Sequence, residues 1–366
     1  MTDIKDIAYL EMAYGLAEKA RGWASPNPYV GAVVVRREAI IGYGYHERPG
    51  KPHAEAVALE RAGRPARGST LYITLEPCVH WGRTPPCADA VIGAGPKRVV
   101  VSSFDPNPLV FQKGIRKLRA AGIDVSVGLL KERNVALNEG YIKHITRGIP
   151  FVTLKAALSL DGRTATRTWD SRWISSPLTR DYVHLLRGEQ DAIMVGIQTI
   201  LKDDPLLTVR HPQWAGKKVV RVILDSHLRL PLRARILSSL SAGGIIVFTA
   251  GRAPSRKRNL LEKRGIEVVE IPGASGPVNI SKVLTHLGGR GITRLLVEAG
   301  SRLLTTMVEG RFADKLFLTL SPRLIGGVAA PSLIEGEGVR RVQDSWPIRR
   351  VTTFTIGDDT VIEGYL

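Results

Sequence analysis

The sequence predicts an α/β protein that is built from two domains. Strand-like and helix-like segments alternate along the chain and are separated by short turns rich in glycine and proline, a pattern typical of α/β layers. A length of 366 residues exceeds one typical domain and indicates two. A helix-like stretch ends at Arg147-Gly148-Ile149-Pro150, where glycine and proline mark a boundary. We therefore expect domains over residues 1–148 and 149–366.

The elements of the first domain follow from apolar periodicity. Helical spacing predicts a helix over residues 3–21, and apolar runs predict a strand pair at 30–35 and 40–45. Further strands are expected at 70–75, 98–102 and 125–127, with helices at 53–62, 88–94 and 113–121.

The second domain resumes the alternation directly after the boundary. Strands are expected at 151–157, 219–224, 244–249, 267–271 and 294–297, with helical segments between them and a helix at 301–308. We find no internal repeat and no low-complexity segment.

Composition indicates a cytoplasmic protein that is not bound to a membrane. No stretch approaches the ~18 uninterrupted apolar residues of a membrane helix. The N-terminal residues alternate charged and apolar side chains and lack a secretory apolar core. The only two cysteines are Cys78 and Cys87, and in a reducing compartment a metal role outranks a disulfide.

The net charge of +18 raises the possibility of a nucleic-acid partner. However, the basic excess is spread along the chain, with 21 Lys and Arg against 14 Asp and Glu in residues 1–148, and 31 against 20 in the rest. A spread excess without a basic tail fits a small phosphorylated substrate at least as well. We therefore expect no nucleic-acid partner.

A split zinc-binding pattern is the strongest chemical signal in the first domain. His53 stands two residues before Glu55, and Cys78 follows a proline and precedes Cys87. One imidazole and two thiolates leave a tetrahedral zinc with one open position, which suits a catalytic water. This order of residues is the signature of zinc deaminases, although eight residues instead of two separate the cysteines here.

The expected local structure favours the same chemistry. Pro52 fits the start of a helix, which places His53 and Glu55 in its first turn, and Cys87 opens a second short helix. Helix N-termini stabilise negative charge by roughly 0.3–1 kcal/mol each, which favours thiolates. Glu55 is expected to move protons between the water and the substrate. The alternatives are a structural zinc site closed by His80, or two buried cysteines with an unrelated histidine, but neither explains Glu55.

Three segments of the first domain resemble one known family. They are NPYVGAV at 27–33, PHAE at 52–55 and EPCVHWGRTPPC at 76–87. Together they resemble the bifunctional riboflavin-biosynthesis proteins, in which a pyrimidine deaminase is fused to a 5-amino-6-(5-phosphoribosylamino)uracil reductase. The resemblance implies a cytidine-deaminase-like, three-layer first domain, with substrate contacts at Asn27 and, on the long loop between the cysteines, at Arg83.

The resemblance continues through the second domain, in the segments KAALSLDGR at 155–163, WISS at 173–176, DAIMVG at 191–196, DDPLLTVR at 203–210 and VEAGS at 297–301. It implies a dihydrofolate-reductase-like fold that takes hydride from NADPH. The implied cofactor contacts are Ala157, Trp173, Thr199, Asp203, Gly300 and Ser301. The implied substrate contacts are Ser171, Arg187, Leu207, Arg210 and Glu298, and Lys155 and Asp203 are the implied catalytic residues for proton handling.

The residues themselves support this second site less strongly. No G-x-G-x-x-G follows a strand, so a Rossmann site is not indicated. Gly300 before a helix offers backbone N–H groups to a phosphate, although such a turn is also routine. Three positions depart from the family's commonest pattern: Trp169 and Gln198 stand where glycine is frequent, and Ala299 replaces a glycine.

The resemblance implies a zinc-dependent hydrolytic deamination of 2,5-diamino-6-(5-phosphoribosylamino)pyrimidin-4-one, followed by NADPH-dependent reduction of its ribosyl group to ribityl. It also implies a homo-oligomer. The main alternative is a zinc-dependent nucleic-acid deaminase of the tRNA type with an accessory C-terminal domain. A second alternative is a non-catalytic binding protein stabilised by zinc.

Overall fold

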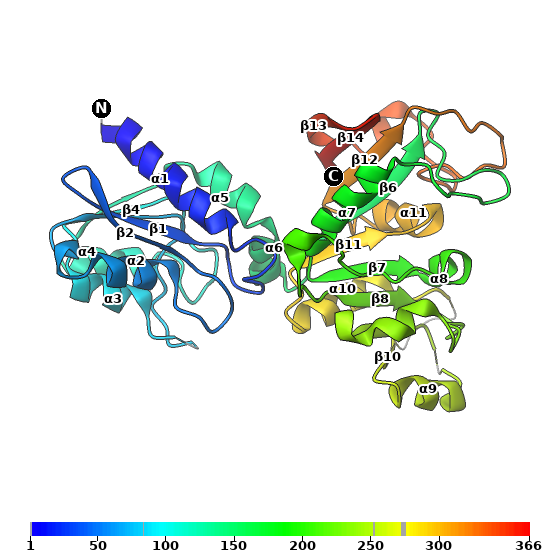
Figure 1. The fold of residues 1–366 in the computed structure, drawn as a ribbon, viewed down its shortest axis with the longest axis horizontal. Helices are drawn as coiled ribbons and strands as arrows, with labels where there is room; N and C mark the ends of the chain where they lie inside the picture. The colour runs from blue at the N-terminus through cyan, green and yellow to red at the C-terminus, as the bar shows by residue number, and fades with distance from the viewer. Residues whose placement is uncertain (1, 83, 252, 272–275) are drawn as a thin grey trace. The chain divides into compact units, whose positions relative to one another are not determined.

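A computed structural model describes residues 2–82, 84–251, 253–271 and 276–366, so the predicted substrate contact Arg83 lies outside the described residues. The chain divides into two units, Met1–Gly148 and Ile149–Leu366 (Figure 1). Among the described helices, none combines the length and the apolar character that a membrane span requires.

The first unit is organised by a five-stranded mixed sheet with the order β2-β1-β3-β4-β5. β1 is antiparallel to both β2 and β3, and β3, β4 and β5 run parallel. The strands are β1 (Gly31–Arg36), β2 (Ala39–Tyr45), β3 (Thr70–Ile73), β4 (Arg98–Val101) and β5 (Asp124–Val127). The helices are α1 (Thr2–Glu18), α2 (Ala54–Ala62), η1 (Arg64–Ala66), α3 (Cys87–Ala94), α4 (Lys113–Ala120), α5 (Lys131–Leu137) and α6 (Glu139–Arg147).

Helices cover both faces of this sheet, so the first unit has three layers. Along β1, Ala32 and Val34 pack in a cluster with residues of α2, α3 and α4. Their neighbours Val33 and Val35 point to the other face and pack against Leu10 of α1. This alternation is the period-2 pattern of a strand that is buried on both sides.

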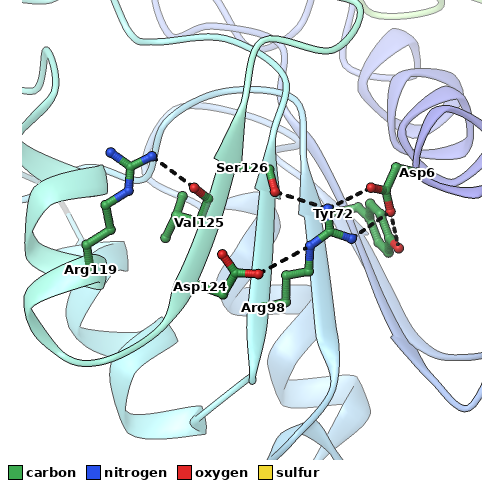
Figure 2. Close-up of polar contacts among 7 residues, drawn as sticks. All are labelled: Asp6, Tyr72, Arg98, Arg119, Asp124, Val125 and Ser126. Carbon is green, nitrogen blue, oxygen red and sulfur yellow. Dashed lines mark hydrogen bonds and ion pairs between the residues drawn. The ribbon is translucent and has the colours of Figure 1, made fainter. Parts of the chain in front are cut away.

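A buried ion pair fixes α1 on the sheet (Figure 2). The carboxylate of Asp6, which is 2% exposed, accepts hydrogen bonds from Arg98 Nη1 at 3.0 Å, Arg98 Nη2 at 2.8 Å and the Tyr72 hydroxyl at 2.9 Å. Arg98 also donates to Ser126 Oγ at 3.0 Å and forms an ion pair with Asp124 at 3.7 Å. One carboxylate of α1 is thereby tied to β3 and β4, and through Arg98 to β5.

The second unit is organised by a nine-stranded sheet with the order β10-β9-β8-β7-β11-β6-β12-β14-β13. The first seven strands of this order run parallel. β14 runs antiparallel to both of its neighbours, β12 and β13. The strands are β6 (Phe151–Ser159), β7 (Ala192–Gly196), β8 (Val220–Leu224), β9 (Ile245–Thr249), β10 (Glu267–Glu270), β11 (Arg294–Glu298), β12 (Lys315–Ser321), β13 (Arg349–Ile356) and β14 (Asp359–Tyr365).

Helices pack on both faces of this second sheet as well. The helices are α7 (Pro177–Gly188), α8 (Ile197–Asp203), η2 (Pro212–Trp214), η3 (Arg235–Ala242), α9 (Ser255–Glu262), α10 (Ile280–Gly289), α11 (Ser301–Glu309) and η4 (Val342–Asp344). Met194 of β7 packs in a cluster with α10 and α11, whereas its neighbours Ile193 and Val195 pack in a cluster with residues of α8, η3 and α9.

The antiparallel end of this sheet, β12 to β14, is the main feature that the sequence reading did not locate. β13 reads RRVTTFTI, and its side chains are exposed or half-buried on both faces. A strand without a buried face shows no alternation of apolar and polar residues, so periodicity cannot mark it.

Candidate active sites

The ends of two helices bring the predicted zinc ligands together. His53 is the N-cap residue of α2, just before its first turn, and Cys87 is the first residue of α3. Cys78 follows β3 in the loop that leads to α3. One ligand atom from each residue lies within 4.8 Å of the other two. Zn–N and Zn–S bonds of about 2.0–2.3 Å fit donors at such separations.

Hydrogen bonds define which ring nitrogen of His53 faces the sulfurs. Nδ1 lies 3.1 Å from Cys87 Sγ and 3.7 Å from Cys78 Sγ, while Nε2 contacts Thr84 Oγ1 at 3.3 Å. In the tautomer with hydrogen on Nε2, Thr84 Oγ1 accepts from Nε2–H, and the lone pair of Nδ1 faces the two sulfurs as a metal ligand requires. The hydrogen bond from Cys87 lowers the pKa of the Cys78 thiol to about 4. The donor set thus fits zinc.

Glu55 lies in the first turn of α2 beside these donors. Its side chain is 3% exposed, and burial raises the pKa of its carboxyl above the ordinary value. Glu55 nevertheless lines the same cavity as the zinc donors. It is therefore placed to exchange a proton with a molecule in that cavity.

The loops around the cavity are held by Glu76, the first residue of the EPC motif. Its buried carboxylate accepts hydrogen bonds from the backbone N–H groups of Asp105 at 3.3 Å, Gln112 at 3.0 Å and Ile115 at 3.2 Å. A Cβ atom at Gly114 would stand 2.2 Å from the Pro77 carbonyl oxygen, so only glycine allows this approach. Glu76 thereby joins the cysteine loop to the start of α4.

The cavity has a volume of about 390 Å³ and contains residues that motif reasoning missed. The predicted Asn27 does line it, and its amide donates to His46 Nε2 at 2.9 Å. Asp105 and Tyr141 also line it, and the Tyr141 hydroxyl donates to Asp105 Oδ1 at 2.8 Å. Burial raises the pKa of Asp105 to about 6. Spacing gave no signal for Asp105 or Tyr141, because the fold alone brings them to the zinc donors.

His80 does not close the fourth zinc position among the described residues. It lines the cavity, but it is not part of the group formed by His53, Cys78 and Cys87. The geometry therefore favours an open, catalytic site over a closed, structural one.

In the second unit, the predicted residues gather at the carboxyl ends of neighbouring parallel strands. Lys155 of β6 and Glu298 of β11 are register partners. Arg187 of α7 donates to both carboxylate oxygens of Glu298, from Nε at 2.6 Å and from Nη2 at 2.8 Å. Burial lowers the pKa of Lys155, with Glu298 opposing that shift. These three charges form one cluster, in which the Arg187 and Glu298 side chains are 12% and 13% exposed.

Arg210 and His184 extend this cluster. Arg210 is exposed and donates to Thr208 Oγ1 at 2.9 Å, next to the buried Leu207. Arg187 donates to the Thr208 carbonyl at 3.2 Å, so both arginines form hydrogen bonds with Thr208. His184, one turn before Arg187 on α7, was not predicted, and burial together with the two arginines lowers its pKa to about 4.

The predicted cofactor residues lie on three adjacent strands or directly after them. Ala157 is on β6, Thr199 and Asp203 are on α8 after β7, and Gly300 and Ser301 begin α11 after β11. Ligands of open α/β sheets bind at such carboxyl ends. The remaining cofactor residue, Trp173, lies in the loop between β6 and α7 together with the predicted substrate contact Ser171. Trp173 is exposed and stacks under Arg180.

The structure shows side-chain contacts for two of the three residues that depart from the family's commonest pattern. Trp169 has a φ of 67°, a conformation that favours glycine, and Lys202 Nζ lies 3.6 Å from its ring centre. Ala299 is half-buried and packs against the core between β11 and α11. The third, Gln198, is exposed on α8.

Comparisons with known proteins cover both units. Residues 3–103 match the cytidine and deoxycytidylate deaminase zinc-binding region, and residues 150–362 match the RibD C-terminal domain. The chain is 43% identical to the riboflavin biosynthesis protein RibD of Aquifex aeolicus, over 98% of this chain and 97% of that protein. It is 40% identical to RibD of Escherichia coli, over 89% and 90%.

The chain belongs to the RibD family.

Solved structures of the family agree with the fold. RibD of Acinetobacter baumannii superposes with a TM-score of 0.88 at 33% identity, covering 100% of this chain and 99% of that one. A diaminohydroxyphosphoribosylaminopyrimidine deaminase/5-amino-6-(5-phosphoribosylamino)uracil reductase of Thermotoga maritima superposes with a TM-score of 0.86 at 34% identity, covering 100% and 99%. The predicted fold class, a cytidine-deaminase-like domain followed by a dihydrofolate-reductase-like domain, is confirmed.

Family membership also establishes the general activity. The chain is a bifunctional riboflavin-biosynthesis enzyme that combines a deaminase with a reductase and uses Zn²⁺ and NADPH. The family assignment, the bifunctional activity and the two cofactors predicted from the sequence are confirmed. The individual roles of the site residues stay predictions.

Proposed function

We propose that residues 1–148 deaminate 2,5-diamino-6-(5-phosphoribosylamino)pyrimidin-4-one, and that residues 149–366 then reduce the ribosyl group of the product with NADPH. The observation that carries this proposal is the open donor set of His53, Cys78 and Cys87 with buried Glu55 beside it. A cavity of about 390 Å³ at those residues has the size of a small-molecule site.

In the deaminase unit, His53, Cys78 and Cys87 would hold the zinc. Zinc at such a site supplies a Lewis acid that activates water near neutral pH. Glu55 then accepts a proton from the attacking water and delivers it to the ring nitrogen and the departing amine. Asn27 is held by its hydrogen bond to His46 and orients the pyrimidine. Arg83 is proposed to contact the phosphate.

In the reductase unit, Arg187 and Glu298 position the substrate together with Ser171, Leu207 and Arg210. NADPH supplies the hydride. Lys155 and Asp203 handle the accompanying proton, and the lowered pKa of Lys155 supports this role because a less basic amine releases its proton more readily.

The cofactor is proposed to lie beside Ala157 of β6 and beside Thr199 and Asp203 of α8, which follows β7, with Trp173 next to it. Gly300 and Ser301 at the start of α11 offer backbone N–H groups to a cofactor phosphate.

We further propose that the enzyme acts in the cytoplasm as a homo-oligomer, on a small phosphorylated pyrimidine and without nucleic acid. The spread of basic residues over both halves of the sequence supports a small anionic substrate over a polyanion.

The test is product analysis by mass spectrometry. The zinc-loaded enzyme is incubated with the diaminopyrimidinone ribosyl phosphate, with and without NADPH. Deaminated product alone in the absence of NADPH, and ribityl product in its presence, are the expected results. Absence of deamination by folded, zinc-loaded enzyme would reject the proposed substrate.

The rival tRNA-type deaminase is tested in the same preparation. It requires RNA binding that weakens steeply with salt, and it requires deamination of a base within an RNA. Either result would replace the proposed small-molecule substrate.

A further inference from the structure

Two polar side chains in the wall of the zinc cavity are not zinc donors. Asp105 and Tyr141 both line the cavity. Asp105 belongs to the loop between β4 and α4, and Tyr141 lies in the first turn of α6. The Tyr141 hydroxyl donates a hydrogen bond of 2.8 Å to Oδ1 of the Asp105 carboxylate. Two segments that are 36 residues apart in the sequence therefore meet at one contact in the cavity wall.

The two oxygens of the Asp105 carboxylate have different surroundings. Oδ1 accepts hydrogen bonds from the Tyr141 hydroxyl at 2.8 Å and from the backbone N–H of Asn107 at 2.9 Å. Across the described parts of the chain, no hydrogen bond reaches Oδ2. A carboxylate offers about two acceptor sites on each oxygen, so Oδ1 is fully used and Oδ2 is not. Since Asp105 is 6% exposed, Oδ2 gains from a donor that enters the cavity.

The orientation of this carboxylate depends on the donors at Oδ1. The Asp105 backbone is fixed, because its N–H donates to Oε2 of buried Glu76 at 3.3 Å. Rotation about the Cβ–Cγ bond of an aspartate is otherwise soft, with a broad range of angles. The Asn107 N–H comes from the same turn of the chain, whereas the Tyr141 hydroxyl comes from a separate helix. Two donors from different segments leave the carboxylate plane with one favoured orientation.

Tyr141 is itself held firmly at this position. The N-cap residue of α6, Asn138, is 1% exposed. Its side chain accepts from the Tyr29 N–H at 2.7 Å and donates to the Tyr29 carbonyl at 3.1 Å. The Tyr141 ring packs against the core cluster of the first unit. Burial raises the pKa of the Tyr141 hydroxyl, so this group keeps its proton and remains a donor.

The charge of Asp105 suits a substrate that carries hydrogen-bond donors. Burial raises the pKa of its carboxyl to about 6, although the hydrogen bonds with Asn107 and Tyr141 oppose the rise. At pH 7 and above, the carboxylate is therefore mainly ionised and acts only as an acceptor. A diaminopyrimidinone presents amino and ring N–H groups, which are donors. The free Oδ2 and such a ring are complementary.

We propose that the Tyr141 hydroxyl is a positioning group of the deaminase. It holds Oδ1 of Asp105 so that Oδ2 accepts a hydrogen bond from an N–H group of the bound pyrimidine. Tyr141 acts through Asp105 and not on the reacting atoms. The hydrogen bond to Oδ2 forms in the bound substrate and persists in the transition state, so Tyr141 contributes to substrate binding more than to the chemical step.

This inference rests on the proposed deamination of the diaminopyrimidinone, and Tyr141→Phe tests it because only the hydroxyl is lost. In the zinc-loaded, full-length enzyme, KM for the diaminopyrimidinone should rise roughly 3- to 10-fold, while kcat stays within about twofold of wild type. The zinc content and the reductase rate should not change. Tyr9→Phe is the matched control, since the Tyr9 hydroxyl donates to the Glu38 carbonyl at 3.0 Å, outside the cavity lining.

A double-mutant cycle shows whether Tyr141 acts through Asp105. Asp105→Ala removes both carboxylate oxygens and should raise KM on the order of tenfold or more. Adding Tyr141→Phe to Asp105→Ala should change KM by less than about twofold, since the hydroxyl then has no carboxylate to hold. The zinc content of each variant shows that its first unit is folded.

Three results would overturn the inference. A purely structural contact would lower stability in Tyr141→Phe and leave KM unchanged. A double variant whose KM rises by the product of the two separate increases would show that Tyr141 acts independently of Asp105. Either of these results would overturn the inference alone. A wild type that binds zinc but does not deaminate the diaminopyrimidinone would overturn it together with the proposed function.

Discussion

The two sites of this enzyme are assembled in different ways. In the deaminase unit, His53, Cys78 and Cys87 lie close in sequence, and short helix-terminal segments bring their donor atoms within 4.8 Å. In the reductase unit, Lys155 and Glu298 meet only because β6 and β11 are neighbours in a parallel sheet. The spacing of motif residues along the chain predicts a site of the first kind. A site of the second kind depends on which strands the fold makes neighbours.

The largest effect is expected at Glu55. Glu55→Gln keeps the shape of the side chain but removes its ability to accept a proton, so deamination should fall about 10²- to 10⁴-fold. Reduction of a supplied uracil intermediate should be unchanged, because every residue proposed for the reductase site belongs to residues 149–366. Both rates are followed by product mass. Glu60→Gln, at an exposed position of the same helix, is the control. Full deaminase activity in Glu55→Gln would remove Glu55 from the mechanism.

Breaking the Arg187–Glu298 ion pair of the reductase site should destabilise the second unit strongly. Glu298→Leu leaves the Arg187 guanidinium buried without its partner, which costs about 3–5 kcal/mol. The double variant with Arg187→Leu should recover much of this loss, since of the three charges only Lys155 then remains, and burial already favours its neutral amine. Denaturant unfolding of the three variants measures the coupling. A double variant no more stable than Glu298→Leu would contradict the explanation by charge.

The ion pair of Asp6 and Arg98 in the first unit lies away from the cavity of the zinc donors. A variant of this pair therefore tests stability separately from deaminase activity. Asp6→Asn weakens the contacts of α1 with Arg98 and Tyr72 (Figure 2) and should lower the free energy of unfolding by about 2 kcal/mol. At a temperature where the variant is folded, the deaminase kcat should match wild type. A lower kcat in fully folded Asp6→Asn would show that α1 positions the site.

His184 should make the second unit sensitive to acid. Its folded pKa of about 4 lies below the ordinary value near 6.5. The unfolded chain therefore binds the proton more tightly, and the stabilisation present above pH 6.5 is lost as pH falls toward 4. Between pH 8 and pH 5, wild type should lose roughly 1–2 kcal/mol more than His184→Gln. Equal losses in the two proteins would show that His184 is not held neutral.

The smallest effect is expected at Trp169. Its φ of 67° strains a non-glycine residue by roughly 1 kcal/mol, but its ring also contacts Lys202. Trp169→Gly relieves the strain and removes the contact, so the stability should change by less than about 1 kcal/mol. Calorimetry measures that change, and reductase kinetics give KM alongside it. A large rise in KM would show that the indole also contacts the substrate.

The sequence predicted the first unit closely because its strands and helices have regular apolar periods, and helix α3 begins at Cys87 as expected. His53 proved to be the N-cap of α2 rather than part of its first turn. β12 to β14 were missed, and in β13 the exposed, threonine-rich residues carry no apolar period. Asp105, Tyr141 and His184 were missed for a different reason: no motif surrounds them, and only the tertiary fold brings them to their sites.

The central claim is that two independent sites act in sequence, and removal of zinc tests it most directly. The chelator-treated protein is given the diaminopyrimidinone substrate, or the deaminated uracil intermediate with NADPH, and the products are identified by mass. We expect deamination to disappear, to return when zinc is added back, and reduction to proceed at the rate of the untreated enzyme throughout. Loss of both reactions in protein whose second unit remains folded, or deamination without zinc, would contradict the account.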